Sequence, residues 1–209
     1  MPPSPPPTLL LSVLGPPGSG KGTQCSLLTA RYPQIFTHHL SMGDVLRDEV
    51  RDPESPYKAV LEENLREGRL GAKEMVCGII GRAIRGAIDG EEARKGRGIV
   101  LLDGFPRKLD TAEYFQDTVA PIPILLVIQC TTDILETRLA ARKREDNDVD
   151  TIRKRIAVYE EETAKVVQRF EEDGKSVVRV DGDGDVEDVA RNVFRGLEGV
   201  LSLRGYGVC

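Results

Sequence analysis

A glycine-rich turn between a short apolar run and an amphipathic segment restricts the fold of this chain more than any other feature. The apolar run Leu9–Leu14 is followed by Gly15-Pro16-Pro17-Gly18-Ser19-Gly20-Lys21-Gly22-Thr23-Gln24. Glycines allow backbone N–H groups to converge on an anion at a helix N-terminus, where the helix dipole favours negative charge, and a lysine adds a point charge. A plain Gly/Pro turn with a surface lysine accounts less well for the strand, the spacing and the helix. The stretch therefore predicts a binding loop for nucleotide phosphate.

Composition narrows the class of protein and its partners. The 209 residues suit one large α/β domain, and the net charge of -5 gives no global basic field that would attract nucleic acid or an anionic membrane. Four cysteines without CxxC spacing predict free thiols in a reducing compartment, cytoplasmic with the nucleus as a second option. Residues 1–8 are expected to form a disordered Pro-rich leader. The run Leu9–Leu14 is too short for a signal peptide or a membrane span.

Apolar runs that alternate with helical patterns predict an α/β fold with a five-stranded parallel sheet and helices on both faces. The expected strands are Leu9–Leu14, 36–40, Ile99–Asp103, 124–128 and Ser176–Asp181. Four expected helices span Lys21–Arg31, Lys73–Asp89, 151–172 and 186–201. A further helix is capped by Ser41, and another starts at Ser55 and Pro56 and ends at Gly68. Two more begin near Lys108 and near Thr132. The domain would comprise residues 9–203, with 204–209 as a loose tail.

Polar residues follow the predicted strands where a phosphate site would lie. Asp103 ends a central strand, so its carboxylate is expected beside the phosphate loop, where it can orient magnesium-bound water. Arg47 lies two turns into its helix and can point at a second phosphate, which an arginine binds bidentately, although alone it would read as an ordinary solvated residue. His38 and His39 favour packing at a strand end over a metal site, because no carboxylate or cysteine pattern accompanies them.

The motifs resemble those of the nucleoside monophosphate (NMP) kinases of the adenylate and UMP-CMP kinase family. The general phosphate-loop pattern has Ser or Thr directly after the lysine, and the glycine found here, Gly22, resembles this family's variant of the loop. The segments 41–47, 103–107 and 138–155 follow in the family's order. The resemblance, from Thr8 to about Leu203, implies a three-layer P-loop NTPase fold with a small NMP-binding helical insertion at about 41–71. It also implies a lid at about 142–147, which here is truncated. The implied reaction is direct, magnesium-dependent transfer from ATP to an NMP.

The same resemblance implies the site residues. Donor ATP would be bound by Gly15, Pro16, Pro17, Gly18, Ser19, Gly20, Lys21, Gly22, Thr23, Arg138, Arg142 and Gly184. The acceptor would be bound by Met42, Arg47, Arg69, Leu70, Gly71, Gly104, Phe105, Pro106, Arg107, Thr111, Arg144 and Arg155. Catalysis would fall to Lys21, Arg107, Arg142, Arg144 and Arg155, and Asp103 would hold Mg²⁺ through water.

The identity of the acceptor depends on fewer residues. The stretch 51–57 resembles the UMP-CMP kinase branch and favours a pyrimidine acceptor, UMP or CMP and also dCMP. Thr111 stands where relatives carry Gln or Asn, and Gly71-Ala72 where they carry a β-branched residue and proline. An adenylate kinase that uses AMP is the first alternative, and a nucleotide-binding regulator with weakened catalysis the second. The expected partners are small-molecule nucleotides, without nucleic acid or membrane, bound by a monomer.

Overall fold

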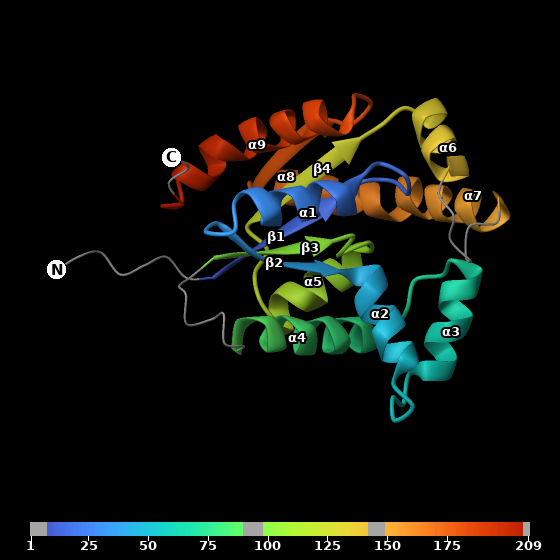
Figure 1. Ribbon diagram of the computed structural model, residues 1–209. Coiled ribbons are helices and arrows are strands. Elements are labelled where there is room, and N and C mark those ends of the chain that lie inside the picture. The colour runs from blue at the N-terminus through green and yellow to red at the C-terminus, as the bar shows by residue number, and fades with distance from the viewer. Residues whose placement is uncertain (1–7, 90–97, 142–148, 207–209) are drawn as a thin grey trace.

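A central parallel sheet organises the computed structural model, which describes residues 8–89, 98–141 and 149–206. The five strands are β1 (Leu9–Leu14), β2 (Phe36–Ser41), β3 (Ile99–Asp103), β4 (Ile124–Gln129) and β5 (Ser176–Asp181). They pair in parallel in the order β2-β3-β1-β4-β5, so β1 lies at the centre (Figure 1). The predicted fold class and its five-stranded parallel sheet are confirmed.

Helices cover both faces of this sheet. They are α1 (Lys21–Arg31), α2 (Met42–Arg51), α3 (Lys58–Glu67), α4 (Lys73–Asp89), α5 (Leu109–Thr118), α6 (Thr132–Ala141), α7 (Val149–Val158), the π-helix η2 (Tyr159–Thr163), α8 (Ala164–Glu172) and α9 (Val186–Ser202). Buried side chains of α1 and α9 pack on one face of the sheet, and those of α4, α5 and α8 pack on the other. Among the described residues, no helix is long and apolar enough to cross a membrane.

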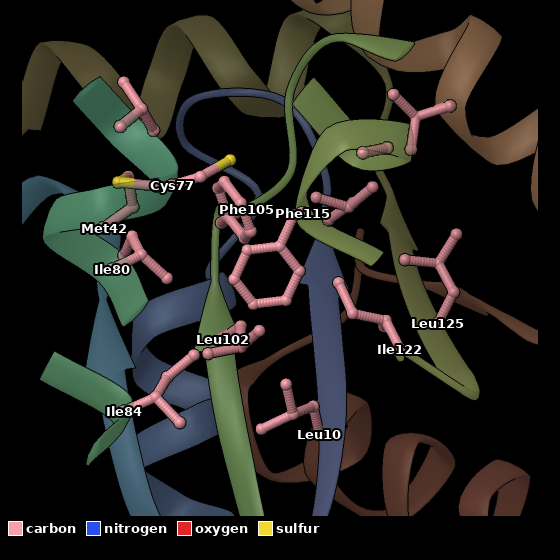
Figure 2. Close-up of a cluster of buried hydrophobic side chains, with 14 of the residues drawn as sticks. Leu10, Met42, Cys77, Ile80, Ile84, Leu102, Phe105, Phe115, Ile122 and Leu125 are labelled. Carbon is pink, nitrogen blue, oxygen red and sulfur yellow. The ribbon is translucent and has the colours of Figure 1, made fainter. Parts of the chain in front are cut away.

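The core divides into two clusters because side chains alternate along each strand. On β1, Leu10 and Leu14 face the α4 side, whereas Leu11 and Val13 face the α1 side. Figure 2 shows the first cluster, where Leu10 lies among side chains of α4, β3 and α5. Burial raises the pKa of the Cys77 thiol, on α4 in this cluster, to about 11, so this thiol is neutral at physiological pH.

Helices α2 and α3 project beyond the carboxyl end of the sheet (Figure 1). Ser41 caps α2, as predicted, because its side chain accepts a hydrogen bond from the Asp44 N–H at 3.4 Å. Gly68 ends α3, as predicted, in the left-handed conformation with φ of 68°. The helix begins at Lys58, two residues after the predicted first-turn residue Pro56. The Ser55 hydroxyl accepts a hydrogen bond from the Tyr57 N–H at 3.2 Å, as a capping residue would, and donates to Glu49 Oε1 at 2.8 Å.

The structure departs from the predicted boundaries in two other places. The expected continuous helix 151–172 contains the π-helical turn η2, in which the Thr163 hydroxyl donates to the Arg107 carbonyl at 3.1 Å. Part of the expected loose tail, through Tyr206, packs on the body, since Tyr206 is only 5% exposed and joins the α9 cluster. The predicted lid and most of the predicted leader lie outside the described residues, as does the end of the tail.

One buried polar contact links β1 to the segment after β3. The Ser12 hydroxyl, fully buried, donates to the Phe105 carbonyl oxygen at 2.5 Å. We expect Ser12→Ala to lower the free energy of unfolding by roughly 1–3 kcal/mol, because it leaves that carbonyl without its donor in the core. Urea unfolding would measure the loss, with Ser202→Ala at an exposed position as the control. Equal stabilities of the two variants would contradict this role.

Candidate functional site

A cavity of about 780 Å³ opens at the carboxyl end of the sheet. Its walls come from the loop between β1 and α1, from α2 and α3, from the segment after β3, and from α6, α7 and η2. In open parallel sheets this edge is where ligands bind, because the loops that follow the strands converge there. The fold therefore brings residues from distant parts of the sequence to one concave site.

The loop between β1 and α1 forms one end of the cavity. Gly18 and Gly20 adopt positive φ angles of 86° and 85°, which glycine adopts without strain. Helix α1 begins at Lys21 without a side-chain cap, so the N–H groups of its first turn can bind an anion. The Lys21 ammonium donates to the carbonyl oxygens of Gly15 and Pro16 at 2.7 and 2.9 Å. The loop is thus shaped to receive phosphate.

Asp103 lies directly beside this loop, at the end of β3. It pairs in register with Val13 of β1, and its Oδ2 lies 3.3 Å from His39 Nε2. A Cβ atom added to Gly22 would lie 3.2 Å from the same oxygen, so the glycine leaves room for the carboxylate. A carboxylate with water and phosphate oxygens is the ligand set that Mg²⁺ prefers, and Asp103 fits such a role.

His39 contributes more to this neighbourhood than strand-end packing alone. Its ring nitrogen, the Asp103 carboxylate and the Cys25 thiol offer ligand atoms that all lie within 4.8 Å of one another. Burial raises the pKa of the Cys25 thiol well above its ordinary value, and the negative charge of Asp103 raises it further. Cys25 is therefore a neutral core thiol behind the phosphate loop, while His39 orients the Asp103 carboxylate.

Three arginines from separate segments face the cavity. Arg47 comes from α2, Arg107 from the turn after β3 and Arg155 from α7. The Arg107 Nε atom donates to the Gly104 carbonyl at 2.8 Å, which fixes the guanidinium. Burial lowers the pKa of Arg107, the charge of Asp103 opposes this, and the charges of Arg155 and Arg47 lower it further. These guanidinium groups are thus close enough to repel one another, and an anion between them would relieve the repulsion.

The wall of the cavity at which the acceptor was predicted combines apolar residues with arginines. Met42 and Thr111 are each 5% exposed, and the Thr111 hydroxyl lies 3.2 Å from Asp110 Oδ1. Arg69 is held by an ion pair with Glu63 at 2.6 Å. The predicted acceptor residues that line the cavity are Met42, Arg47, Arg69, Leu70, Gly71, Gly104, Phe105, Arg107, Thr111 and Arg155. Pro106 does not line it, and Arg144 lies outside the described residues.

The end of the cavity at which the donor was predicted is formed by α6 and the turn after β5. Arg138 Nη2 donates to the Gly184 carbonyl at 2.9 Å, which joins two residues that were predicted from distant motifs. The predicted donor residues that line the cavity are Gly15, Pro17, Gly18, Ser19, Gly20, Lys21, Gly22, Thr23, Arg138 and Gly184. Pro16 does not line it but accepts the Lys21 hydrogen bond, and Arg142 lies outside the described residues.

Sequence reasoning missed several residues of the cavity wall. Gln24 lines the donor side and donates from Nε2 to the Val186 carbonyl at 3.1 Å. Asn64 and Leu65 line the acceptor side from α3, and Tyr159 does so from η2. The signal for Asn64 was present in the helical period, since it lies three residues after the buried Leu61 and therefore on the inward face of α3.

A phosphate loop at the head of a parallel sheet, facing arginines across one cavity, defines a P-loop phosphate-binding protein. A family model described as "Adenylate kinase" matches residues 13–175. The chain belongs to the adenylate kinase family. This family binds nucleotide substrates and uses ATP, generally with Mg²⁺.

Individual relatives agree with this assignment. The chain is 34% identical to a UMP-CMP kinase of Lentinula edodes over 92% of this chain and 87% of the relative. It is 36% identical to a uridylate kinase of Saccharomyces cerevisiae over 91% of both chains. It is also 36% identical to adenylate kinase isoenzyme 1 of Caenorhabditis elegans, over 91% of this chain and 88% of the relative. The predicted enzyme class, a nucleoside monophosphate kinase, is confirmed.

The close approach at Gly15 gives a test of the loop. A Cβ atom there would lie 2.5 Å from the backbone carbonyl oxygen of Ile128, and backbone cannot move aside cheaply. We expect Gly15→Ala to raise the Kd for ATP by about tenfold or more, because overpacking displaces the loop. Gly199→Ala is the matched control, because a Cβ on this exposed position of α9 would meet no atom within 4 Å. Unchanged ATP affinity in Gly15→Ala, measured by calorimetry, would contradict the proposed loop geometry.

Proposed function

We propose that this enzyme transfers the γ-phosphoryl group of ATP to a pyrimidine nucleoside monophosphate, UMP or CMP and also dCMP. The observation that carries the proposal is that Arg47, Arg107 and Arg155 face the Lys21 loop within one cavity. Such an arrangement can hold the donor phosphates and the acceptor phosphate close enough for transfer. Two relatives named UMP-CMP kinase and uridylate kinase support a pyrimidine acceptor, as does the stretch 51–57.

In the proposed reaction the acceptor phosphate oxygen attacks the γ-phosphorus in line as the bond to ADP breaks. The acceptor phosphate is already ionised at neutral pH, so transfer depends on position and on charge neutralisation. Lys21 and the loop N–H groups would hold the donor phosphates, and Arg47 and Arg107 the acceptor phosphate. Arg155, with Arg142 and Arg144 outside the described residues, would neutralise the migrating group.

Magnesium would supply additional charge neutralisation on the donor phosphates. We assign its water-mediated contact to Asp103, which lies at the end of β3 and is held by His39. The glycine at position 22 supports this assignment, since it replaces the hydroxyl residue that would otherwise bind the ion directly and leaves space for the carboxylate. Asp103 would therefore orient the hydrated ion rather than replace its water.

An AMP acceptor is the second candidate. It is supported by the adenylate kinase of Caenorhabditis elegans, which is as similar to this chain as the yeast uridylate kinase is. A coupled assay of ADP formation with ATP, Mg²⁺ and separate UMP, CMP, dCMP and AMP acceptors would decide. Turnover of the pyrimidine nucleotides above AMP supports the proposal. Turnover of AMP alone would replace it with adenylate kinase activity, and binding without transfer would indicate a regulator.

We also propose that the enzyme acts as a monomer in the cytoplasm, with the nucleus as a second compartment. The described cysteines Cys25, Cys77 and Cys130 are free thiols, which suits a reducing compartment. Sedimentation at working concentration would test the monomer.

Arginine substitutions on one helix test the proposed catalytic roles. Arg155 faces the cavity, whereas Arg153 of the same helix is exposed. We expect Arg155→Ala to lower kcat by about 10³, because it removes charge from the transferring group. Arg153→Ala should stay within about twofold of the wild-type value. Equal activities of the two variants would contradict the assignment of Arg155.

Substitutions of Lys21 in the phosphate loop and of Arg107, the proposed acceptor arginine, form a second test. Lys21→Ala and Arg107→Ala should each nearly abolish turnover, since both remove a charge that the proposed transition state requires. Circular dichroism would check that both variants remain folded. A folded Lys21→Ala enzyme with near-normal steady-state activity would reject the proposed site.

A further inference from the structure

We propose that Asn64 reads the acceptor base, through a side-chain amide that hydrogen-bonds the polar edge of the pyrimidine. This inference rests on the proposed function and deepens it, because it assigns base recognition to a residue on α3.

Asn64 is a polar residue on the inward face of α3. It lies three residues after Leu61, which is 1% exposed, and next to Leu65, which also lines the cavity. Residues at this spacing share one face of a helix. The Asn64 side chain is only partly buried and lines the cavity, so its amide is accessible to a ligand there.

No hydrogen bond to the Asn64 side chain occurs within the described parts of the chain. The backbone carbonyl of Asn64 accepts from the Arg69 N–H at 2.9 Å, so the end of α3 is capped without the side chain. Of the two side-chain amides among the residues that line the cavity, Gln24 already donates to Val186 on the donor side. Asn64 is thus the amide with both groups available on the acceptor side.

Gly71 lies close to the Asn64 amide. A Cβ atom on Gly71 would lie 3.7 Å from Asn64 Nδ2, 3.0 Å from Val76 Cγ2 and 2.7 Å from Met75 Cε. A side chain at Gly71 would therefore displace Met75 and Val76, which pack against the glycine, and would also contact the Asn64 amide. Val76 and Met42 line the same cavity, where they provide apolar walls for a flat ring.

Thr111 cannot provide the same recognition. Its single hydroxyl already lies 3.2 Å from Asp110 Oδ1, and its carbonyl accepts from the Cys77 thiol at 3.7 Å. An amide carries both a donor and an acceptor, which two groups on a base edge can use at once. We therefore assign recognition of the base to Asn64 instead of Thr111.

The chemistry of the amide also predicts which bases it accepts. Uracil presents an N–H donor beside a carbonyl acceptor, and cytosine presents an amino donor beside a ring-nitrogen acceptor. A half-turn of the amide exchanges its donor and acceptor positions, and no described side chain fixes the Asn64 amide in one orientation. Asn64 can therefore bind either base, so UMP and CMP should have similar KM values.

Steady-state kinetics with Asn64→Leu test the role directly. We expect the KM for UMP and for CMP to rise by about fivefold to tenfold, the loss of one or two hydrogen bonds, while the KM for ATP stays unchanged. Asn192→Leu is the matched control, because Asn192 is exposed on α9. Adding Thr111→Asn to Asn64→Leu should restore part of the loss, since it returns an amide to the acceptor side.

The outcomes separate this inference from the proposed function. An acceptor KM in Asn64→Leu equal to that of the control, or an equal rise in the KM for ATP, would overturn the role of Asn64 whichever acceptor the enzyme uses. If the wild-type enzyme phosphorylates AMP alone, the pyrimidine proposal and the UMP–CMP equivalence fail. A selective rise in the KM for AMP in Asn64→Leu would in that case still support a base contact by Asn64.

Discussion

Repulsion between like charges is the constraint on which the site depends. Arg47, Arg107 and Arg155 face one cavity together with Lys21, and the charges of Arg155 and Arg47 lower the pKa of Arg107. Backbone carbonyls offset part of this repulsion, since those of Gly15 and Pro16 bind Lys21 and that of Gly104 binds Arg107. These contacts hold the cations in position before phosphate arrives, so charge neutralisation needs little rearrangement.

The segment that follows β3 connects this charged site to the rest of the fold. Asp103 pairs with β1 and His39, the Phe105 carbonyl accepts from Ser12, and the Arg107 carbonyl accepts from Thr163 of η2. Three neighbouring elements are therefore fixed to one five-residue turn. Thr163, in the π-helical turn η2, contacts this five-residue segment. π-Helical turns are often found at functional sites.

Local patterns made most of the fold predictable, and long-range contacts account for what was missed. The bounds of β3, β5, α1 and α4 follow from apolar periods and capping residues, which act within a few residues of the chain. The π-helical turn contacts Arg107 through a hydrogen bond from Thr163, and Tyr206 is buried against α9. Both contacts join residues far apart in the sequence or beyond the last helix. The helical period places Asn64 on the inward face of α3, but only the structure shows that its amide lies close to Gly71.

Two departures from the family pattern, at Gly71 and Thr111, lie where the acceptor is proposed to bind. In-line transfer requires fixed distances between donor loop, arginines and migrating group, so a change at Lys21 or Arg107 would misalign the reacting atoms. A base edge requires only complementary donors and acceptors within reach, and the residue that provides them can change position. Gly71 and Thr111 each lack a side-chain group of the family pattern, and Asn64 offers an amide to the same cavity. Single motif positions therefore define the reaction better than they define the acceptor.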